Sequence, residues 1–163
     1  MNAKILYRIC AVVFALFAAG HTLGFLTFRP ETPEGLAVYA SMRDVHFAFG
    51  SANASYADFY TGFGLFVSAC MVLFAYLAWQ IGGWTATNPT AARQAGGALL
   101  AVQLANILIC FRYFASVQVA FAATGAALIA MALFVSRSSK ASGVDSLTSG
   151  VSSVGRTKPS ATA

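Results

Sequence analysis

The sequence predicts an all-α, polytopic membrane protein: a four-helix transmembrane bundle with a short helix in the first extracytoplasmic loop. Two observations support this fold class. Apolar residues make up 58% of the 163 residues and charged residues only 9%, against about 25% charged in an average soluble domain. The apolar residues also gather in four stretches, each near the roughly 20 residues that cross a hydrocarbon core of about 30 Å.

The first predicted span covers about residues 5–28 and follows Lys4 and Arg8. A cleaved signal peptide is the alternative, because a basic start precedes an apolar run and the small residues Ala18, Ala19 and Gly20. The apolar character continues past these small residues as far as Phe28, which favours a retained span.

Residues 29–58 interrupt the apolar pattern and hold four of the five acidic residues. Thr32 followed by Pro33 is a helix-start signal, with the threonine as the cap and the proline at the first helical position. We therefore expect a short amphipathic helix over about 33–45, lying on the membrane or covering the bundle. The small and polar residues 50–55 predict a turn.

Three further spans follow the loop. The second covers about 59–81 and is expected to stop at Gly82 and Gly83, because glycine often ends a helix. The third covers about 90–111, after the cap-and-proline pair Asn88-Pro89. The fourth covers about 114–135, after a tight turn at Arg112. A single helix across both would be roughly 65 Å long, about twice the hydrocarbon core.

The chain therefore divides into a transmembrane domain, residues 1–135, and a tail, residues 136–163. The tail is rich in Ser, Thr, Gly and Ala, so it buries too little apolar area to offset its ordering entropy. It is predicted to be a disordered cytoplasmic segment.

Lysine and arginine set the expected orientation, because they accumulate on the cytoplasmic side. With the N-terminus inside, seven of these residues are cytoplasmic and three are outside. We therefore expect a multi-pass protein of the inner (plasma) membrane with both termini in the cytoplasm. The cytoplasmic set is Lys4, Arg8, Arg93, Arg137, Lys140, Arg156 and Lys158, and the outer set is Arg29, Arg43 and Arg112.

Small residues recur at four-residue spacing on three spans, which lets membrane helices approach closely. They predict a compact bundle and leave homo-oligomerisation open. The three series are Ala11, Ala15 and Ala19; Gly97, Ala101 and Ala105; and Ala122, Ala126 and Ala130.

Polar side chains within spans are costly in lipid and are therefore candidates for a functional site. Most of them fall in the outer half of the predicted bundle and the cytoplasmic half has almost none, which predicts an outward-facing polar pocket beneath the loop helix. The candidate ligand-binding residues are His21, Asp58, Tyr60, Gln103, Asn106, Arg112 and Gln118.

Each candidate also has a structural interpretation. Asp58 is suited to cap the second span, and His21 to hydrogen-bond a neighbouring helix. Gln103 and Asn106 share a helix face and are suited to hold helices together. Arg112 is suited to reach the lipid headgroups or to pair with Asp58, and Tyr60 to join an interfacial aromatic belt.

Several classes of function lack support in the sequence. The two histidines are far apart, and no Cys or Glu stands at metal-ligand spacing. No glycine-rich phosphate loop and no nucleophile elbow is present, so no metal and no cofactor is expected. The thinly spread positive charge does not form the basic stripe of a nucleic-acid-binding protein.

The run HFAFGSANASYADFYTGFGL, residues 46–65, is similar to a pattern in small uncharacterised bacterial membrane proteins that broadly resemble DoxX-type four-helix bundles. Residues 20–25 fit the same pattern. The resemblance implies a four-helix architecture and brings no established activity. The positions it covers are His21, Asn53, Ser55, Asp58, Tyr60, Gly62 and Gly64.

The leading functional hypothesis is therefore non-enzymatic. The protein is expected to bind a membrane lipid, another small molecule or a protein partner through the outward pocket. The alternative is a membrane-embedded enzyme acting on a lipid or quinone, with His21 and Asp58 as an acid–base pair. A proton or ion path is disfavoured, because the inner half lacks the ionisable residues that a relay needs.

Overall fold

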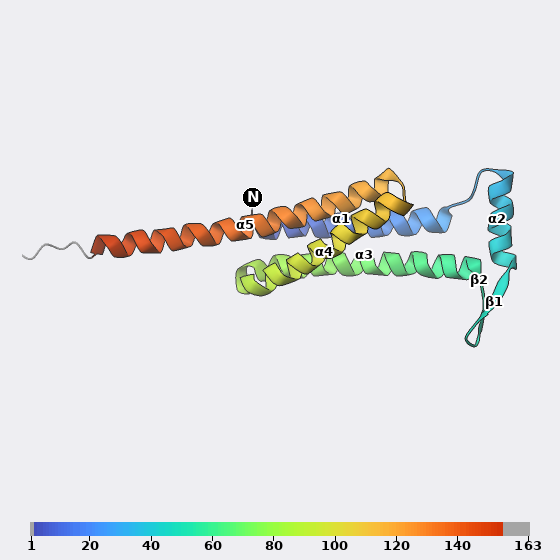
Figure 1. The fold of residues 1–163 in the computed structure, drawn as a ribbon, viewed down its shortest axis with the longest axis horizontal. Coiled ribbons are helices and arrows are strands. Elements are labelled where there is room, and N and C mark those ends of the chain that lie inside the picture. The colour runs from blue at the N-terminus through green and yellow to red at the C-terminus, as the bar shows by residue number, and fades with distance from the viewer. Residues whose placement is uncertain (1, 155–163) are drawn as a thin grey trace, which may run out of the picture.

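The computed structural model describes the backbone of residues 2–154 and the side chains of residues 2–137. Among these residues, five helices and one β-hairpin follow each other, and four of the helices are long and apolar enough to cross a membrane. These four helices run side by side, and α2 stands across one end of the bundle (Figure 1). We name this end the hairpin end and the opposite end the tail end. The predicted all-α four-helix bundle is confirmed.

Helix α1, Ala3–Thr27, is the helix around which the bundle packs. Asn2 caps it by accepting a hydrogen bond from the Lys4 amide at 3.0 Å. Its buried face includes Tyr7, Cys10 and Phe14 and packs against α3 and α5. Because burial follows this helical face, the outward residues Leu16 and Leu23 are left exposed for lipid to cover.

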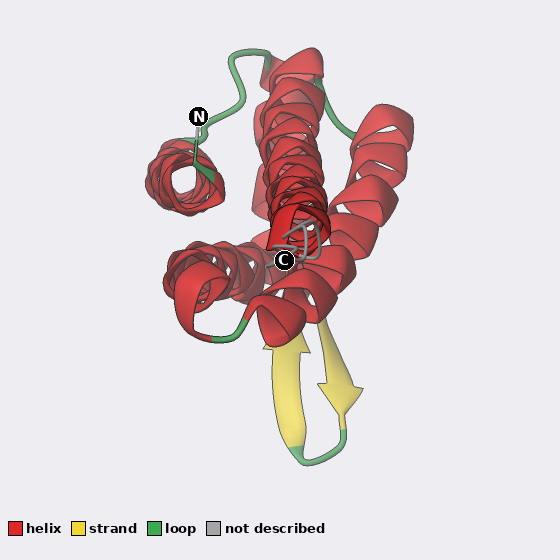
Figure 2. Cartoon of the chain, turned by 90° about the vertical axis from the view of Figure 1, so that its left-hand side faces the viewer, coloured by secondary structure: helices red, strands yellow, loops and turns green. Residues whose placement is uncertain are grey.

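Helix α2, Pro33–Asp44, begins where the threonine and proline predict, and the Thr32 side chain accepts from the Gly35 amide at 3.1 Å. None of its residues is buried. A β-hairpin follows, formed by β1, His46–Phe49, and β2, Ala52–Ser55. It projects to one side of the bundle (Figure 2). Phe47 and Phe49 point to one face and pack on Phe59 at ring-centroid distances of 5.2 and 5.3 Å.

Helix α3, Tyr56–Thr87, extends past both ends of the predicted second span. The predicted stop at Gly82 and Gly83 is wrong, because the helix continues through both. Gly82 instead allows a close helix approach: a Cβ there would lie 3.2 Å from Tyr7 Cβ and 3.3 Å from the Lys4 carbonyl. At 1.5 Å per residue α3 is about 48 Å long, so its ends reach beyond a hydrocarbon core of about 30 Å.

Helix α4, Pro89–Tyr113, returns to the hairpin end, and Asn88 caps it as predicted. Helix α5 runs from Ser116 to Val154. Its backbone is helical over residues 136–154, and the disorder expected of residues 136–163 stays a prediction. Once a helix has formed, each added residue gains a hydrogen bond without a new nucleation cost. The rest of the predicted tail, residues 155–163, lies outside the described residues.

Rings of α1 enter notches left by glycines on the other three spans. Phe25 lies at Gly64 of α3, Tyr7 at Gly96 of α4 and Phe14 at Gly125 of α5. Each notch has no room for a Cβ atom, because the ring already occupies that space. The bundle is therefore held by large residues of one helix seated against small residues of its neighbours.

Candidate functional site

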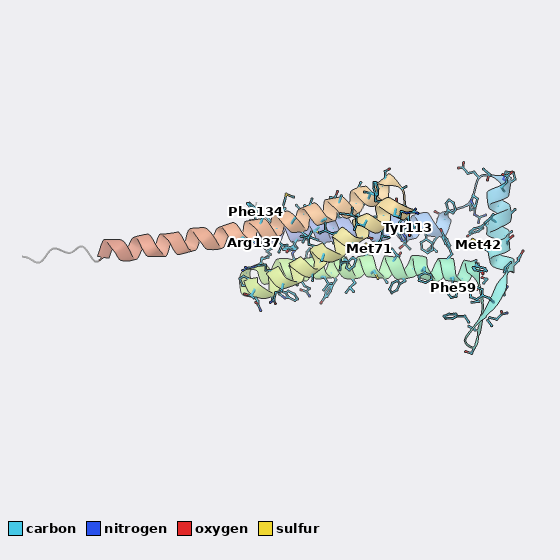
Figure 3. The ribbon with its side chains drawn as sticks, viewed as in Figure 1. Met42, Phe59, Met71, Tyr113, Phe134 and Arg137 are labelled. Atoms are coloured by element: carbon cyan, nitrogen blue, oxygen red, sulfur yellow. The ribbon has the colours of Figure 1, made fainter. Side chains whose placement is uncertain are left out.

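Six polar side chains from all four spanning helices lie in the hairpin-end half of the bundle. Phe17 of α1 links them, because it stacks on His21 at 6.0 Å and also lines a cavity with the amide side chains of α4 and α5. Met71 of α3, labelled midway along the bundle in Figure 3, lines the same cavity. We call this set the polar layer: His21, Thr22, Ser68, Gln103, Asn106 and Gln118.

The first part of the polar layer joins α1 to α3. His21 Nδ1 lies 3.1 Å from Ser68 Oγ, and the Thr22 hydroxyl lies 2.7 Å from the same oxygen. Ser68 is buried, whereas His21 and Thr22 are half-buried. The sequence predicted an interhelical hydrogen bond for His21, and the structure supplies the partner.

The tautomer of His21 depends on the hydroxyl proton of Ser68. Ser68 Oγ lies 3.1 Å from both the Gly64 carbonyl and His21 Nδ1, and its single proton can be donated to only one of them. Donation to Gly64 makes His21 Nδ1 the donor to Ser68 Oγ, and donation to Nδ1 gives the other tautomer. In the first arrangement Nε2 of the neutral ring is an acceptor without a described partner.

Aromatic rings border this acceptor. Phe17 and Phe25 lie one turn before and one turn after His21 on α1, with ring-centroid distances of 6.0 and 5.5 Å to the imidazole. Phe25 in turn contacts Tyr60 of α3 at 6.1 Å. The imidazole thus combines one hydrogen-bond acceptor with flat apolar walls.

The second part of the polar layer joins α4 to α5. Gln103, Asn106 and Gln118 line one small cavity together with Phe14, Phe17 and Met71. Gln103 is only 1% exposed. Sequence spacing places Gln103 and Asn106 on one face, and the fold adds Gln118 from the adjacent helix.

Asp58 lies apart from the polar layer. Its carboxylate accepts from the Ser55 amide and hydroxyl, each at 2.8 Å, and the Ser55 hydroxyl accepts from the Asp58 amide at 3.1 Å. This is a capping box at the start of α3. Ten residues of helix separate Asp58 from Ser68, which is about 15 Å along the axis. Asp58 and His21 are therefore not within hydrogen-bond reach.

The two remaining candidates lie on the surface. Tyr60 is 42% exposed. Arg112 is exposed and its guanidinium carbon lies 5.1 Å from the centre of the Tyr113 ring. No ion pair joins Arg112 to Asp58 among the described side chains. The structure thus brings together four of the seven candidates, His21, Gln103, Asn106 and Gln118, and leaves Asp58, Tyr60 and Arg112 outside.

Thr22 and Ser68 belong to the site although the sequence analysis did not select them. Their hydroxyls commonly bond to the carbonyl four residues earlier in membrane helices, and both do so here, to Ala18 at 2.8 Å and to Gly64 at 3.1 Å. Such residues give no distinct sequence signal, because the additional bond between helices depends on how α1 packs against α3.

A larger cavity, of about 610 Å³, lies at the tail end. The start of α1, the turn between α3 and α4, and α5 surround it. Among the described side chains, Lys4 and Arg93 line it without a carboxylate, and Thr85, Thr90 and Ser136 add hydroxyl groups. From the sequence, these two cations were expected only to favour a cytoplasmic location for this end of the bundle.

Comparison of the chain with protein-family models, with curated proteins and with solved structures gives no match. The resemblance to DoxX-type bundles therefore remains a prediction. Among the described residues, no three His, Cys, Asp or Glu side chains are grouped so that they could hold a metal ion.

Proposed function

We propose that this protein binds a small amphipathic ligand in the hairpin-end half of its transmembrane bundle, without chemical conversion. The observation that supports this proposal most is the environment of the His21 side chain. A half-buried imidazole presents one unused acceptor between aromatic walls, in a region where lipid cannot satisfy polar groups.

The chemistry of the site selects the ligand class. With Nε2 of His21 as the acceptor, the ligand provides a hydroxyl or N–H donor, and Phe17, Phe25 and Tyr60 suit an apolar body beside that donor. A lipid-like alcohol has both features. The enzymatic alternative is less well supported. Asp58 caps α3 about 15 Å along the helix from Ser68, the residue that His21 contacts.

We further propose that the hairpin end faces outward from the plasma membrane and that both termini are cytoplasmic. The excess of lysine and arginine at the tail end supports this orientation. The ligand would then enter from the outer leaflet, between α1 and α3.

Binding can be tested with 1,2-dioctanoylglycerol, which has one free hydroxyl, and with trioctanoylglycerol, in which that hydroxyl is esterified. We expect only the first lipid to raise the thermal unfolding temperature of the protein in detergent. The matched variant is His21→Asn, because the asparagine amide still donates toward Ser68 but lacks the acceptor at the Nε2 position.

His21→Asn should fold, yet lose at least tenfold in affinity for the diacylglycerol. Equal stabilisation by both lipids would contradict recognition of the hydroxyl. Unchanged binding by His21→Asn would remove His21 from the site.

The tail-end cavity favours a second candidate function, binding of a lipid headgroup that contains phosphate. Lys4 and Arg93 provide two positive charges, and Thr85, Thr90 and Ser136 provide hydroxyl groups at one edge of the bundle. Anionic phospholipids on the cytoplasmic side would match this charge in the proposed orientation.

Native mass spectrometry with phosphatidylglycerol would test this second candidate. Lys4→Ala/Arg93→Ala should lose the bound lipid, whereas Arg112→Ala, at the other end of the bundle, should retain it. Competition by inorganic phosphate would indicate a free-anion site instead. Equal lipid retention by the double variant and by Arg112→Ala would contradict the candidate.

A further inference from the structure

Two buried amide atoms in the cavity between α4 and α5 lack hydrogen-bond partners among the described residues. They are Nε2 of Gln103, a donor, and Oε1 of Gln118, an acceptor. Both side chains line the same cavity. Their chemistry is complementary, because one atom needs an acceptor and the other needs a donor.

Leaving both atoms unsatisfied would be costly. A buried amide without a partner loses the hydrogen bonds it makes in water, and surrounding hydrocarbon offers no replacement. The other cavity walls include Phe14, Phe17 and Phe121, which cannot supply strong hydrogen bonds. Among the described side chains neither atom has a partner, and a molecule from outside the chain would satisfy both.

The cavity has a volume of about 10 Å³. That is close to the volume of one water-sized sphere, the smallest space that holds a water molecule. The size of the cavity and its polar lining together indicate a water molecule as the occupant.

Asn106 supplies a third partner. Its Oδ1 atom lies 3.7 Å from the Cys110 thiol, which donates to it. This bond leaves the Asn106 amide nitrogen available to donate into the cavity that Asn106 also lines. A water with two donors and one acceptor around it would make three hydrogen bonds, the usual number for a buried water.

We propose that one structural water molecule occupies this cavity, accepting from Gln103 and Asn106 of α4 and donating to Gln118 of α5. The water completes the polar layer and fixes α4 against α5. This site is independent of the proposed ligand, because His21 and Ser68 take no part in it.

The decisive measurement is a structure of the wild-type protein in a lipid environment at a resolution that shows ordered water. We expect one density peak within hydrogen-bond distance of Gln103 Nε2 and Gln118 Oε1. A direct hydrogen bond between the two glutamines, or an empty cavity, would overturn the proposal.

Unfolding equilibria give a second test. Gln103→Met and Gln118→Met should each raise the unfolding constant by roughly threefold to tenfold, in line with hydrogen bonds in membrane proteins. The double variant should raise the unfolding constant by no more than the more damaging single variant does, because either change removes the same water.

Gln80→Met is the matched control, because the Gln80 amide bonds Tyr76 of its own helix at 2.7 Å, away from the cavity. It should change the unfolding constant by less than about twofold. Should Gln103→Met fail to fold, the less buried Gln118 still provides the test. Fully additive effects of the two substitutions would contradict a shared water.

Discussion

Ser68 shows how one small side chain connects two helices. Its Oγ lies within hydrogen-bond distance of His21 Nδ1 and the Thr22 hydroxyl of α1 and of the Gly64 carbonyl of its own helix. Nothing in the sequence distinguishes Ser68 from other hydroxyl residues in the spans. Its role depends on the register between α1 and α3, which is set by ring-to-glycine contacts such as Phe25 at Gly64.

Replacing Ser68 with alanine should lower the free energy of unfolding by about 0.6 kcal/mol, the mean for interhelical hydrogen bonds in a membrane protein, and by at most about 1.7 kcal/mol. Steric trapping or denaturant titration in mixed micelles would measure it. Thr27→Ala is the control, since the Thr27 hydroxyl bonds only the Leu23 carbonyl of its own helix. Equal losses in the two variants would show that the interhelical bonds add nothing.

Tyr7 contrasts with Ser68, because its buried hydroxyl makes no hydrogen bond to a neighbouring helix in the described part of the chain. Its hydroxyl is buried against Gly96 and has no hydrogen-bond partner among the described residues. Tyr7→Phe removes an unsatisfied group while retaining the ring, so it should stabilise the protein by about 1 kcal/mol. A destabilised Tyr7→Phe variant, measured by the same titration, would mean that the hydroxyl has a partner such as water.

At the scale of elements, sequence patterns locate helices better than they locate helix faces. Thr32-Pro33 and Asn88-Pro89 mark two helix starts correctly, because capping is a local interaction. The small-residue series at Gly97, Ala101 and Ala105 of α4 is exposed instead of packed. The buried face of α4 lies one residue earlier, at Gly96, because Tyr7 of α1 packs there.

The hairpin was predicted only as a turn. Gly50 has a positive φ of 62°, which glycine adopts easily, and Gly-Ser between two strands is a known hairpin signal. The strand signal around it is weak, because β2 consists of small and polar residues. The hairpin depends on Phe47 and Phe49 packing against Phe59 of α3, a contact that local sequence does not reveal.

Adjacent glycines on α4 provide a matched test of the packing of α1 against α4. Gly96→Ala should destabilise the protein by about 1–3 kcal/mol, because its Cβ would collide with the Tyr7 hydroxyl and ring. Gly97 has no atom within 4 Å of a Cβ, so Gly97→Ala should be neutral or stabilising by up to about 1 kcal/mol. Combining Gly96→Ala with Tyr7→Phe should recover part of the loss.

A reversed order of stability for Gly96→Ala and Gly97→Ala would mean that the opposite face of α4 packs in the bundle. Helical content by circular dichroism should stay the same in both variants, which separates a packing effect from a loss of helix.

For the whole molecule, hydropathy predicts the four spans, because each must supply roughly 20 apolar residues. The concentration of polar groups in the hairpin-end half was also predicted, yet their division was not. His21 pairs with Ser68, the amides of α4 and α5 form a separate cavity, and Asp58 caps α3. Depth along a span can be read from sequence, whereas the side of a helix that meets its neighbour depends on packing.

The central claim is a bundle that crosses the membrane with its polar layer in the outer half, and labelling of single cysteines tests it most directly. In a variant without the three native cysteines, Ser51→Cys and Thr87→Cys place thiols at the exposed hairpin turn and at the tail end of α3. A membrane-impermeant maleimide added to intact cells should label Ser51→Cys at once and Thr87→Cys only after permeabilisation. Labelling of Thr87→Cys in intact cells with Ser51→Cys protected would reverse the orientation and contradict the claim.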